Sequence, residues 1–217
     1  MSTDAPQQDA TAGPTTTSRG LLRRDVDSPS GLVLMLHGGT PSSTAPVGRR
    51  SASWHRMAAV QRAVTPDLHA VGASTWLLRY GVRGWNAGAP VADVHWALEQ
   101  ARRELPDVPV VLLGHSMGAR AAVHVAGHAS VVGVVALAPW WLDEPVHGLR
   151  GRHVAAAHGR SDKITSARAT RRYLERAATV AATTEYEDMG RVGHYLLRRT
   201  GAWESFASSR ARRFLEL

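Results

Sequence analysis

The amino-acid sequence predicts an α/β fold: a three-layer α/β/α sandwich built around a mostly parallel sheet. Short runs that are apolar at every position alternate with longer stretches in which apolar residues recur at helical spacing. Strands that are hydrophobic on both faces are typical of a parallel sheet covered by helices on each side. The alternation of strand and helix implies right-handed crossovers between the parallel strands.

The expected elements are separated by glycine and proline breaks. Gly31 precedes the first apolar run, Gly38-Gly39 follows it, and Pro106 and Gly114 enclose the second. The strands that we expect in the sheet are 32–36, 76–80, 108–113, 131–138, 154–157 and a weak final strand at 183–186. The helices that we expect are 53–64, 90–105, one that begins near residue 117, 166–180 and 201–217.

Length and composition bound the domain organisation. A chain of 217 residues that is 44% hydrophobic and 20% charged suits one domain with a sizeable core. Residues 1–18 contain almost nothing apolar and are expected to be a disordered tail, which leaves 19–217 as a single domain. The sequence contains no cysteine, which excludes disulfides, thiolate metal ligands and a cysteine nucleophile.

A nucleophile turn is predicted between the strand 108–113 and the helix that follows it. Gly114-His115-Ser116-Met117-Gly118 matches the pattern G-x-S-x-G in the strand–turn–helix context that the pattern requires. A serine at such a tight turn has a strained backbone, so the flanking residues must lack side chains. The turn lifts the Ser116 hydroxyl clear of the sheet. The first amides of the helix, that of Met117 above all, can then stabilise a developing oxyanion.

With this turn and the segment His37-Gly38-Gly39 after the first buried strand, the chain resembles the α/β-hydrolase fold superfamily over residues 19–217. It is most similar to the small serine hydrolases and esterases that lack a cap domain. The resemblance implies that a backbone amide of this segment completes an oxyanion hole with Met117. The matching residue is Gly39, with Thr40 as the alternative, and His37 is expected to brace the loop without touching substrate.

The resemblance also implies that an acid and then a histidine follow the serine in the chain. His194 is the only histidine after His158 and stands in a loop before the last helix, where the family has its catalytic base. Asp162 ends a glycine-containing turn after the strand 154–157 and matches the family's usual acid. Asp143 is the alternative, because some relatives take the acid one strand earlier.

The expected chemistry is cleavage of a carboxylic ester or a related acyl bond through a Ser-His-Asp triad and an acyl-enzyme. The same residues can serve acyl transfer, thioester cleavage or cofactor-free lyase chemistry. A catalytically silent binding protein can share the fold. The sequence contains no HExxH motif, dinucleotide-binding glycine signature or carboxylate cluster, so neither a metal nor a cofactor is expected.

The chain leaves no room for a cap over the site. Many relatives insert a helical cap between the strands that carry the serine and the acid, but only residues 139–152 separate the third and fourth apolar runs. Only one short edge strand fits before Gly31. We therefore expect an open site for a small-molecule ester, and the pocket residues expected from the sequence are Thr40, Trp85, Trp140 and Trp141.

The basic composition suggests a different class of partner. The net charge is +8, which invites a nucleic-acid or anionic-membrane interpretation. Most arginines are scattered in pairs with acidic residues nearby, and no helix-turn-helix or aromatic–basic RNA module is present, so neither partner is expected. Arg49, Arg50 and Arg120 could attract an anionic substrate.

No export signal or membrane span is visible in the sequence, which favours a cytoplasmic location.

Overall fold

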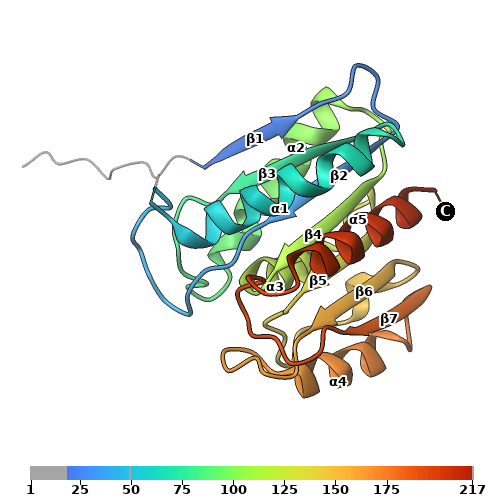
Figure 1. Ribbon diagram of the computed structural model, residues 1–217. Helices are drawn as coiled ribbons and strands as arrows, with labels where there is room; N and C mark the ends of the chain where they lie inside the picture. Colours follow the sequence, from blue (N-terminus) through green and yellow to red (C-terminus); the bar gives the residue numbers. More distant parts are fainter. Residues whose placement is uncertain (1–18, 49, 217) are drawn as a thin grey trace, which may run out of the picture.

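The computed structural model describes residues 19–48 and 50–216. Seven strands within these residues form one sheet (Figure 1). From one edge to the other, the strands lie in the order β1-β3-β2-β4-β5-β6-β7. β1 runs antiparallel to β3, and every other neighbouring pair is parallel. The strands are β1 (Gly20–Arg24), β2 (Gly31–Leu36), β3 (Ala73–Arg79), β4 (Val110–His115), β5 (Val131–Leu137), β6 (His153–His158) and β7 (Thr183–Asp188).

Helices cover both faces of the sheet. α1 and α5 pack beside each other on one face, and α2, α3 and α4 cover the other (Figure 1). The helices are α1 (Ala52–His69), α2 (Ala89–Glu104), α3 (Met117–Val125), α4 (Ala167–Ala177) and α5 (Thr200–Glu216), with a short 3-10 helix η1 (His147–Leu149). This is the predicted α/β/α sandwich, and the prediction of the fold class is confirmed.

The central strands contribute to two separate cores. Every residue of β2 and β4 is buried. Leu34 and Leu36 of β2 pack on the side of α2 and α3, whereas Val33 and Met35 pack on the side of α1 and α5. Successive side chains of a strand point to opposite faces, so a strand between two helical layers must be apolar throughout. This requirement explains the continuous apolar runs of the sequence.

α1 is longer than its apolar pattern predicts. The pattern indicates a helix over 53–64, but α1 continues through Pro66 to His69. Leu68 is fully buried under this last turn, and the Ala70 amide donates to the Pro66 carbonyl at 3.1 Å. Burial of a leucine side chain contributes about 2 kcal/mol. That gain offsets most of the roughly 3 kcal/mol that proline costs inside a helix.

The connection between β5 and β6 contains no cap domain. Between β5 and β6 the chain forms turns and η1, with no inserted cap. Among the described residues before Gly31, β1 is the one strand, and it lies at the edge of the sheet as expected. The tail expected at 1–18 lies outside the described residues. No helix among the residues that are described is long and apolar enough to cross a membrane.

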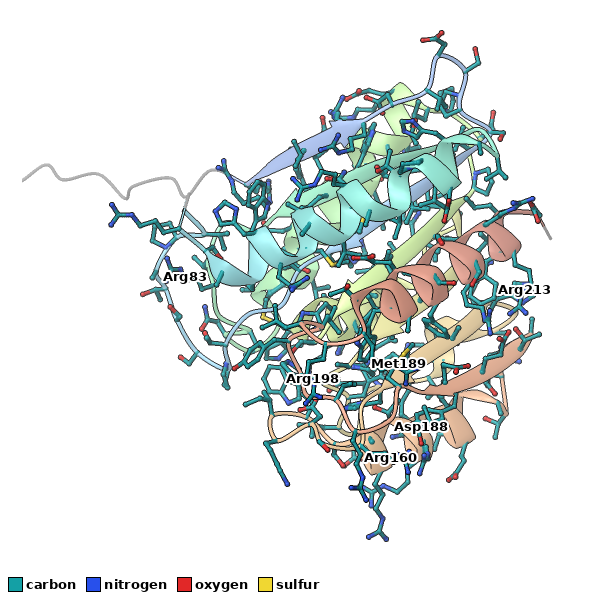
Figure 2. All side chains as sticks on the ribbon, viewed as in Figure 1. Arg83, Arg160, Asp188, Met189, Arg198 and Arg213 are labelled. Carbon is teal, nitrogen blue, oxygen red and sulfur yellow. The ribbon has the colours of Figure 1, made fainter. Side chains whose placement is uncertain are left out.

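Several arginines are held by carboxylates at the β7 edge of the sheet. Arg160 lies 3.3 Å from Asp188, at the end of β7 (Figure 2). Glu185 of the same strand receives two arginines of α5: Arg210 at 2.8 Å, and Arg213. These arginines are therefore paired with carboxylates that lie far from them in the sequence.

Candidate active site

Ser116 stands where β4 turns directly into α3. Its backbone φ of 54° and ψ of −117° lie in a region that residues with a side chain rarely occupy. The Ser116 amide donates to the Leu137 carbonyl of β5 at 3.1 Å. The amides of Ala119 and Arg120 donate to the Ser116 carbonyl at 3.1 and 3.2 Å. These backbone hydrogen bonds hold the serine in its strained conformation.

The two glycines of the motif allow α3 to approach the sheet closely. A Cβ on Gly118 would lie 2.1 Å from the Leu36 carbonyl oxygen at the end of β2. A Cβ on Gly114 would lie 2.4 Å from the Ala119 nitrogen. Neither position has room for any side chain. The spacing of the motif is therefore explained by the packing of the turn.

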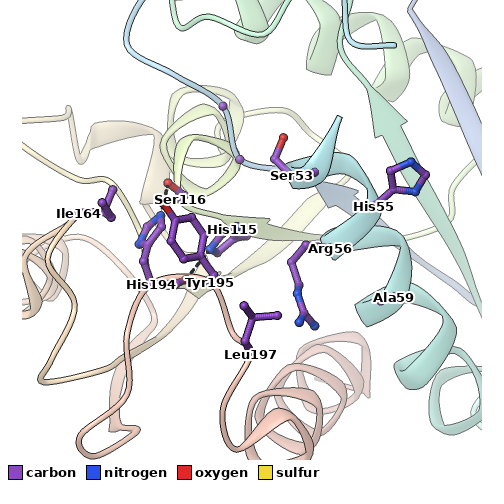
Figure 3. A pocket seen from close by; sticks show the side chains of 13 residues that line it. Ser53, His55, Arg56, Ala59, His115, Ser116, Ile164, His194, Tyr195 and Leu197 are labelled. Atoms are coloured by element: carbon purple, nitrogen blue, oxygen red, sulfur yellow. Dashed lines mark hydrogen bonds between the residues drawn. The ribbon is translucent and has the colours of Figure 1, made fainter. Parts of the chain in front are cut away.

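His194 and Asp162 lie beside Ser116 although they are distant in sequence. His194 Nε2 is 2.9 Å from Ser116 Oγ (Figure 3), and His194 Nδ1 is 2.8 Å from Asp162 Oδ2. Asp162 follows β6 and His194 follows β7, and both strands are parallel to β4, so their loops reach the same edge of the sheet. A hydroxyl, an imidazole and a carboxylate in this order can move a proton away from the serine.

The Asp162 carboxylate is fully buried and accepts hydrogen bonds on both oxygens. Oδ1 accepts from the amides of Ile164 and Thr165 at 2.8 and 2.9 Å. Oδ2 accepts from the Thr165 hydroxyl at 2.9 Å and lies 3.2 Å from His158 Nε2. Burial alone would raise the pKa of Asp162, but the hydrogen bonds from His158, His194 and the two amides outweigh it and hold the pKa well below its usual range. Asp162 is therefore ionised at neutral pH.

Asp143, the alternative acid, does not reach the histidine. Its side chain is fully exposed, and its carboxylate lies 3.6 Å from Arg176. Among the acidic residues that the structure describes, Asp162 is the one that contacts His194. The loop after β6, and not the loop after β5, brings a carboxylate to the site.

Two buried histidines hold the loops around the serine. His115 Nε2 lies 3.0 Å from the carbonyl oxygen of His194, and His37 Nδ1 lies 2.6 Å from that of Gly38. Burial lowers the pKa of His115 to about 3 and that of His37 to about 4. Both rings are therefore neutral near pH 7, and each donates its single N–H to a loop of the site. Neither ring contacts the Ser116 hydroxyl.

Gly39 and Met117 lie against each other next to the serine. A Cβ on Gly39 would lie 2.4 Å from Met117 Cε and 2.4 Å from the Arg83 carbonyl oxygen, so only glycine fits there. Within the described residues, the Gly39 and Met117 amides donate no hydrogen bond. The Thr40 amide is already used, because it donates to the Arg83 carbonyl at 3.0 Å. Two unpaired amides are thus available near Ser116.

A cavity of about 650 Å³ opens beside Ser116 and His194 (Figure 3). Its walls come from α1, the loop after β2 and the loop that carries His194, and most of its lining surface is apolar. Ile164, Tyr195 and Leu197 line it and are each more than half exposed. The volume lies in the range typical of small-molecule sites. Within residues 19–48 and 50–216, no cluster of His, Asp and Glu is arranged to hold a metal ion.

A model of the alpha/beta hydrolase family matches residues 33–216, from β2 to α5. The chain belongs to this family. The matched segment contains Ser116, Asp162, His194 and the glycine loop after β2, and the predicted family is thereby confirmed. No curated protein matches the sequence at a significant level.

Solved structures of the same fold resemble this alpha/beta hydrolase over almost its whole length. A serine hydrolase without a lid from Xanthomonas campestris is 18% identical, with a TM-score of 0.67 over 92% of this chain and 90% of that chain. Est1E from Butyrivibrio proteoclasticus, solved with ferulic acid, is 12% identical, with a TM-score of 0.67 over 92% and 96%. The monoacylglycerol lipase of Paleococcus ferrophilus is 14% identical, with a TM-score of 0.63 over 91% and 99%. At these identities the likeness concerns the fold.

Two of the tryptophans expected in the pocket enclose an arginine of this hydrolase instead. The Arg120 guanidinium lies 4.2 Å from the ring centre of Trp85 and 4.6 Å from that of Trp140. Its Nε is 2.7 Å from the carboxylate of Glu144, which is buried and also lies 2.6 Å from His124. Arg120 is therefore engaged by its neighbours and is not available to attract an anionic substrate.

The other residues expected at the pocket also lie outside the cavity lining. Trp141 is buried, and its indole N–H donates to the Ala119 carbonyl at 3.0 Å. Thr40 is exposed and does not line the cavity. The difference arises because the loop after β5 packs over α3, whereas the cavity beside the serine lies toward α1. Arg50 is exposed, and Arg49 lies outside the described residues.

Several residues around the site carry no motif of their own. His158 and Thr165 both contact Asp162, and Ile164 and Tyr195 line the cavity. Each lies within four positions of Asp162 or His194 in the sequence. Proximity along the chain to the acid and the base is the signal that could have identified them.

Proposed function

We propose that this alpha/beta hydrolase is a serine hydrolase that cleaves carboxylic esters through an acyl-enzyme. The observation that carries the proposal is the hydrogen-bonded series of Ser116, His194 and Asp162 beside an apolar cavity. The strained serine, the paired imidazole and the ionised carboxylate are the groups that nucleophilic catalysis at an acyl carbon requires.

The proposed reaction begins with transfer of the Ser116 hydroxyl proton to His194 Nε2 while Oγ attacks the ester carbonyl carbon. The bond to the alcohol oxygen then breaks, and the alcohol takes the proton from His194. Water attacks the acyl-enzyme with His194 as the base, which releases the acid and restores the Ser116 hydroxyl. Asp162 accepts the Nδ1–H bond of His194 throughout and stabilises the imidazolium.

The amides of Gly39 and Met117 are the proposed donors to the tetrahedral oxyanion. Both are unpaired within the described residues, and Gly39 lines the cavity. Backbone donors of this kind are held by the fold before the reaction starts. Loss of one such donor slows an acyl-transfer enzyme by roughly a hundredfold or more.

Hydrolysis is proposed over acyl transfer because the site is open. With turns and η1 alone between β5 and β6, the loops leave the cavity accessible to water, whereas acyl transfer needs a site that keeps water from the acyl-enzyme. Esters are preferred as substrates because the cavity is mainly apolar. Thioester cleavage, amide cleavage and cofactor-free lyase activity remain alternatives for the same groups.

The test is to treat the protein with a fluorophosphonate probe and to measure its hydrolysis of p-nitrophenyl esters, thioesters and amides. The wild type should be labelled and should cleave short esters, and Ser116→Ala should lose both properties while keeping its circular dichroism spectrum. Equal ester turnover by Ser116→Ala and the wild type would disprove the proposal. If thioesters or amides are cleaved faster than esters, the proposed substrate class changes to that class of compound.

The proposed partner is a small-molecule ester. The predictions of a cytoplasmic location and of no nucleic-acid binding rest on the sequence alone. Gel filtration, with a duplex-binding assay at physiological salt, would test the oligomeric state and the nucleic-acid prediction together.

A further inference from the structure

One charged side chain stands in the apolar cavity beside the serine. Arg56, on the second turn of α1, lines the cavity and is partly buried. Among the described lining residues it is the only one with a permanent charge, and none of the others is Asp or Glu. The first turn of α1 also contains no acidic residue. Within the part of the chain that the structure describes, no carboxylate of the cavity lining competes for the guanidinium.

Arg56 differs from two other partly buried arginines of the chain, Arg120 and Arg210. Arg120 is paired with Glu144, and Arg210 is paired with Glu185. Among the residues that are described, Arg56 has neither a hydrogen-bond partner nor an ion-pair partner. Its five N–H donors are therefore free to bind a ligand that enters the cavity.

The charge of Arg56 acts on the catalytic end of the cavity. Figure 3 shows its side chain directed from α1 toward the side of the cavity where Leu197 lies, with His115 close by. Burial is the main cause that lowers the pKa of His115 to about 3, and the positive charge of Arg56 acts in the same direction. Because His115 directly precedes Ser116, a group bound at Arg56 is near the reacting serine.

We propose that Arg56 is a specificity-determining residue that binds a carboxylate of the substrate, so that the preferred substrates are esters that also carry a free carboxylate. The inference deepens the proposed function and rests on it. An Arg fork matches a carboxylate in two parallel hydrogen bonds. The apolar side chains of Ile164, Tyr195 and Leu197 would cover the hydrocarbon chain between the carboxylate and the scissile ester.

The experiment compares kcat/KM for two esters of the same shape, monoethyl adipate, which is ionised, and ethyl adipamate, which is neutral. A second pair, the acetate ester of hydroxyhexanoate and its amide, moves the carboxylate to the alcohol side of the scissile bond. The wild type should prefer the ionised member of one pair by about tenfold or more, as expected for a charge-assisted hydrogen bond. The preferred pair identifies the side of the ester that carries the carboxylate.

Arg56→Met removes the charge but keeps most of the aliphatic length, and should reduce this preference to about one. Arg56→Lys should keep part of it, because lysine retains the charge but not the fork. Arg62→Met is the matched control, since Arg62 lies on the same helix, is exposed and does not line the cavity. This control should keep the wild-type preference. Added salt should reduce the wild-type preference.

Two outcomes would overturn the inference. The first is a wild type that cleaves p-nitrophenyl butyrate but shows no preference within either pair, which leaves the proposed function standing. The second is a preference for the ionised ester that persists in Arg56→Met. If no ester is cleaved at all, the proposed function fails, and calorimetry with adipate and adipamide decides the role of Arg56. Adipate binding that Arg56→Met abolishes would support the anion site, and no binding by the wild type would refute it.

Discussion

His158 Nε2 lies 3.2 Å from Asp162 Oδ2, the same carboxylate oxygen that His194 approaches at 2.8 Å. His158 is fully buried at the end of β6, and its Nδ1 lies 2.8 Å from the hydroxyl of Thr170 on α4. The carboxylate is therefore tied to the sheet and to α4 as well as to the histidine beside the serine. Such a group cannot rotate away from His194 without breaking buried hydrogen bonds.

Asp162→Asn should lower kcat by roughly a thousandfold or more, because the neutral amide no longer holds the His194 tautomer or stabilises the imidazolium. The measurement is steady-state kinetics on an activated ester. Asp143→Asn is the control and should leave kcat within about twofold of the wild type. The Asp143 side chain is exposed and does not contact His194. A large loss in Asp143→Asn with none in Asp162→Asn would reverse the assignment of the acid.

His158→Leu should lower kcat by about tenfold and the free energy of unfolding by about 1–3 kcal/mol. The buried Asp162 carboxylate and the buried Thr170 hydroxyl each lose a hydrogen-bond partner in this variant. His158→Gln should be milder, since its amide can still donate toward Asp162. Urea unfolding and ester kinetics measure the two effects. Full activity in His158→Leu would show that the backbone amides and Thr165 are enough to position the acid.

Stability should fall as the pH is lowered from about 6.5 toward 4. The pKa of His37 is about 4 and that of His115 about 3 in the folded chain, against the ordinary value of 6.5. In this window the unfolded chain binds protons that the folded chain does not, so unfolding becomes easier as the pH falls. Each ring contributes a slope of up to about 1.4 kcal/mol per pH unit. Asp162 adds to the loss of stability only when the pH falls below the ordinary aspartate pKa of 3.8, because its pKa in the folded chain is lower still.

The measurement is urea unfolding at several pH values between 4.5 and 7. His37→Gln and His115→Gln should each reduce the pH dependence of the unfolding free energy by about the contribution of one imidazole ring. This holds whatever their effect on stability at pH 7. An unchanged slope in both variants would mean that these two rings are not the groups that take up protons on unfolding.

Gly118→Ala should destabilise the fold by about 3 kcal/mol or more, because the new methyl group would lie 2.1 Å from the backbone oxygen of Leu36. Gly201→Ala offers a contrast with the opposite sign. Gly201 lies in α5 with no atom within 4 Å of a built Cβ, and alanine there should stabilise the helix by up to about 1 kcal/mol. Thermal melts of the two variants test both statements, and a neutral Gly118→Ala would mean that α3 can shift.

Much of the fold and part of the site could be predicted from local patterns. The apolar runs indicated the strands of the sheet, because a strand covered on both faces has no polar position. The G-x-S-x-G pattern indicated Ser116, because the glycines are required by the turn itself. The pocket could not be predicted in this way. Trp85 and Trp140 are large and apolar, but their rings stack on Arg120, and sequence spacing does not reveal which loop covers α3.

By itself, the sequence determined the alternation of strands and helices, the family and the position of the G-x-S-x-G turn, since each depends on residues that are neighbours in the chain. Tertiary structure decided which carboxylate meets His194, since that depends on where the loops after β5 and β6 end. It also decided that Arg120 is paired with Glu144, whereas Arg56 has no partner among the residues that the structure describes. The physical reason is that charge pairing and cavity shape arise between segments that are far apart in the sequence.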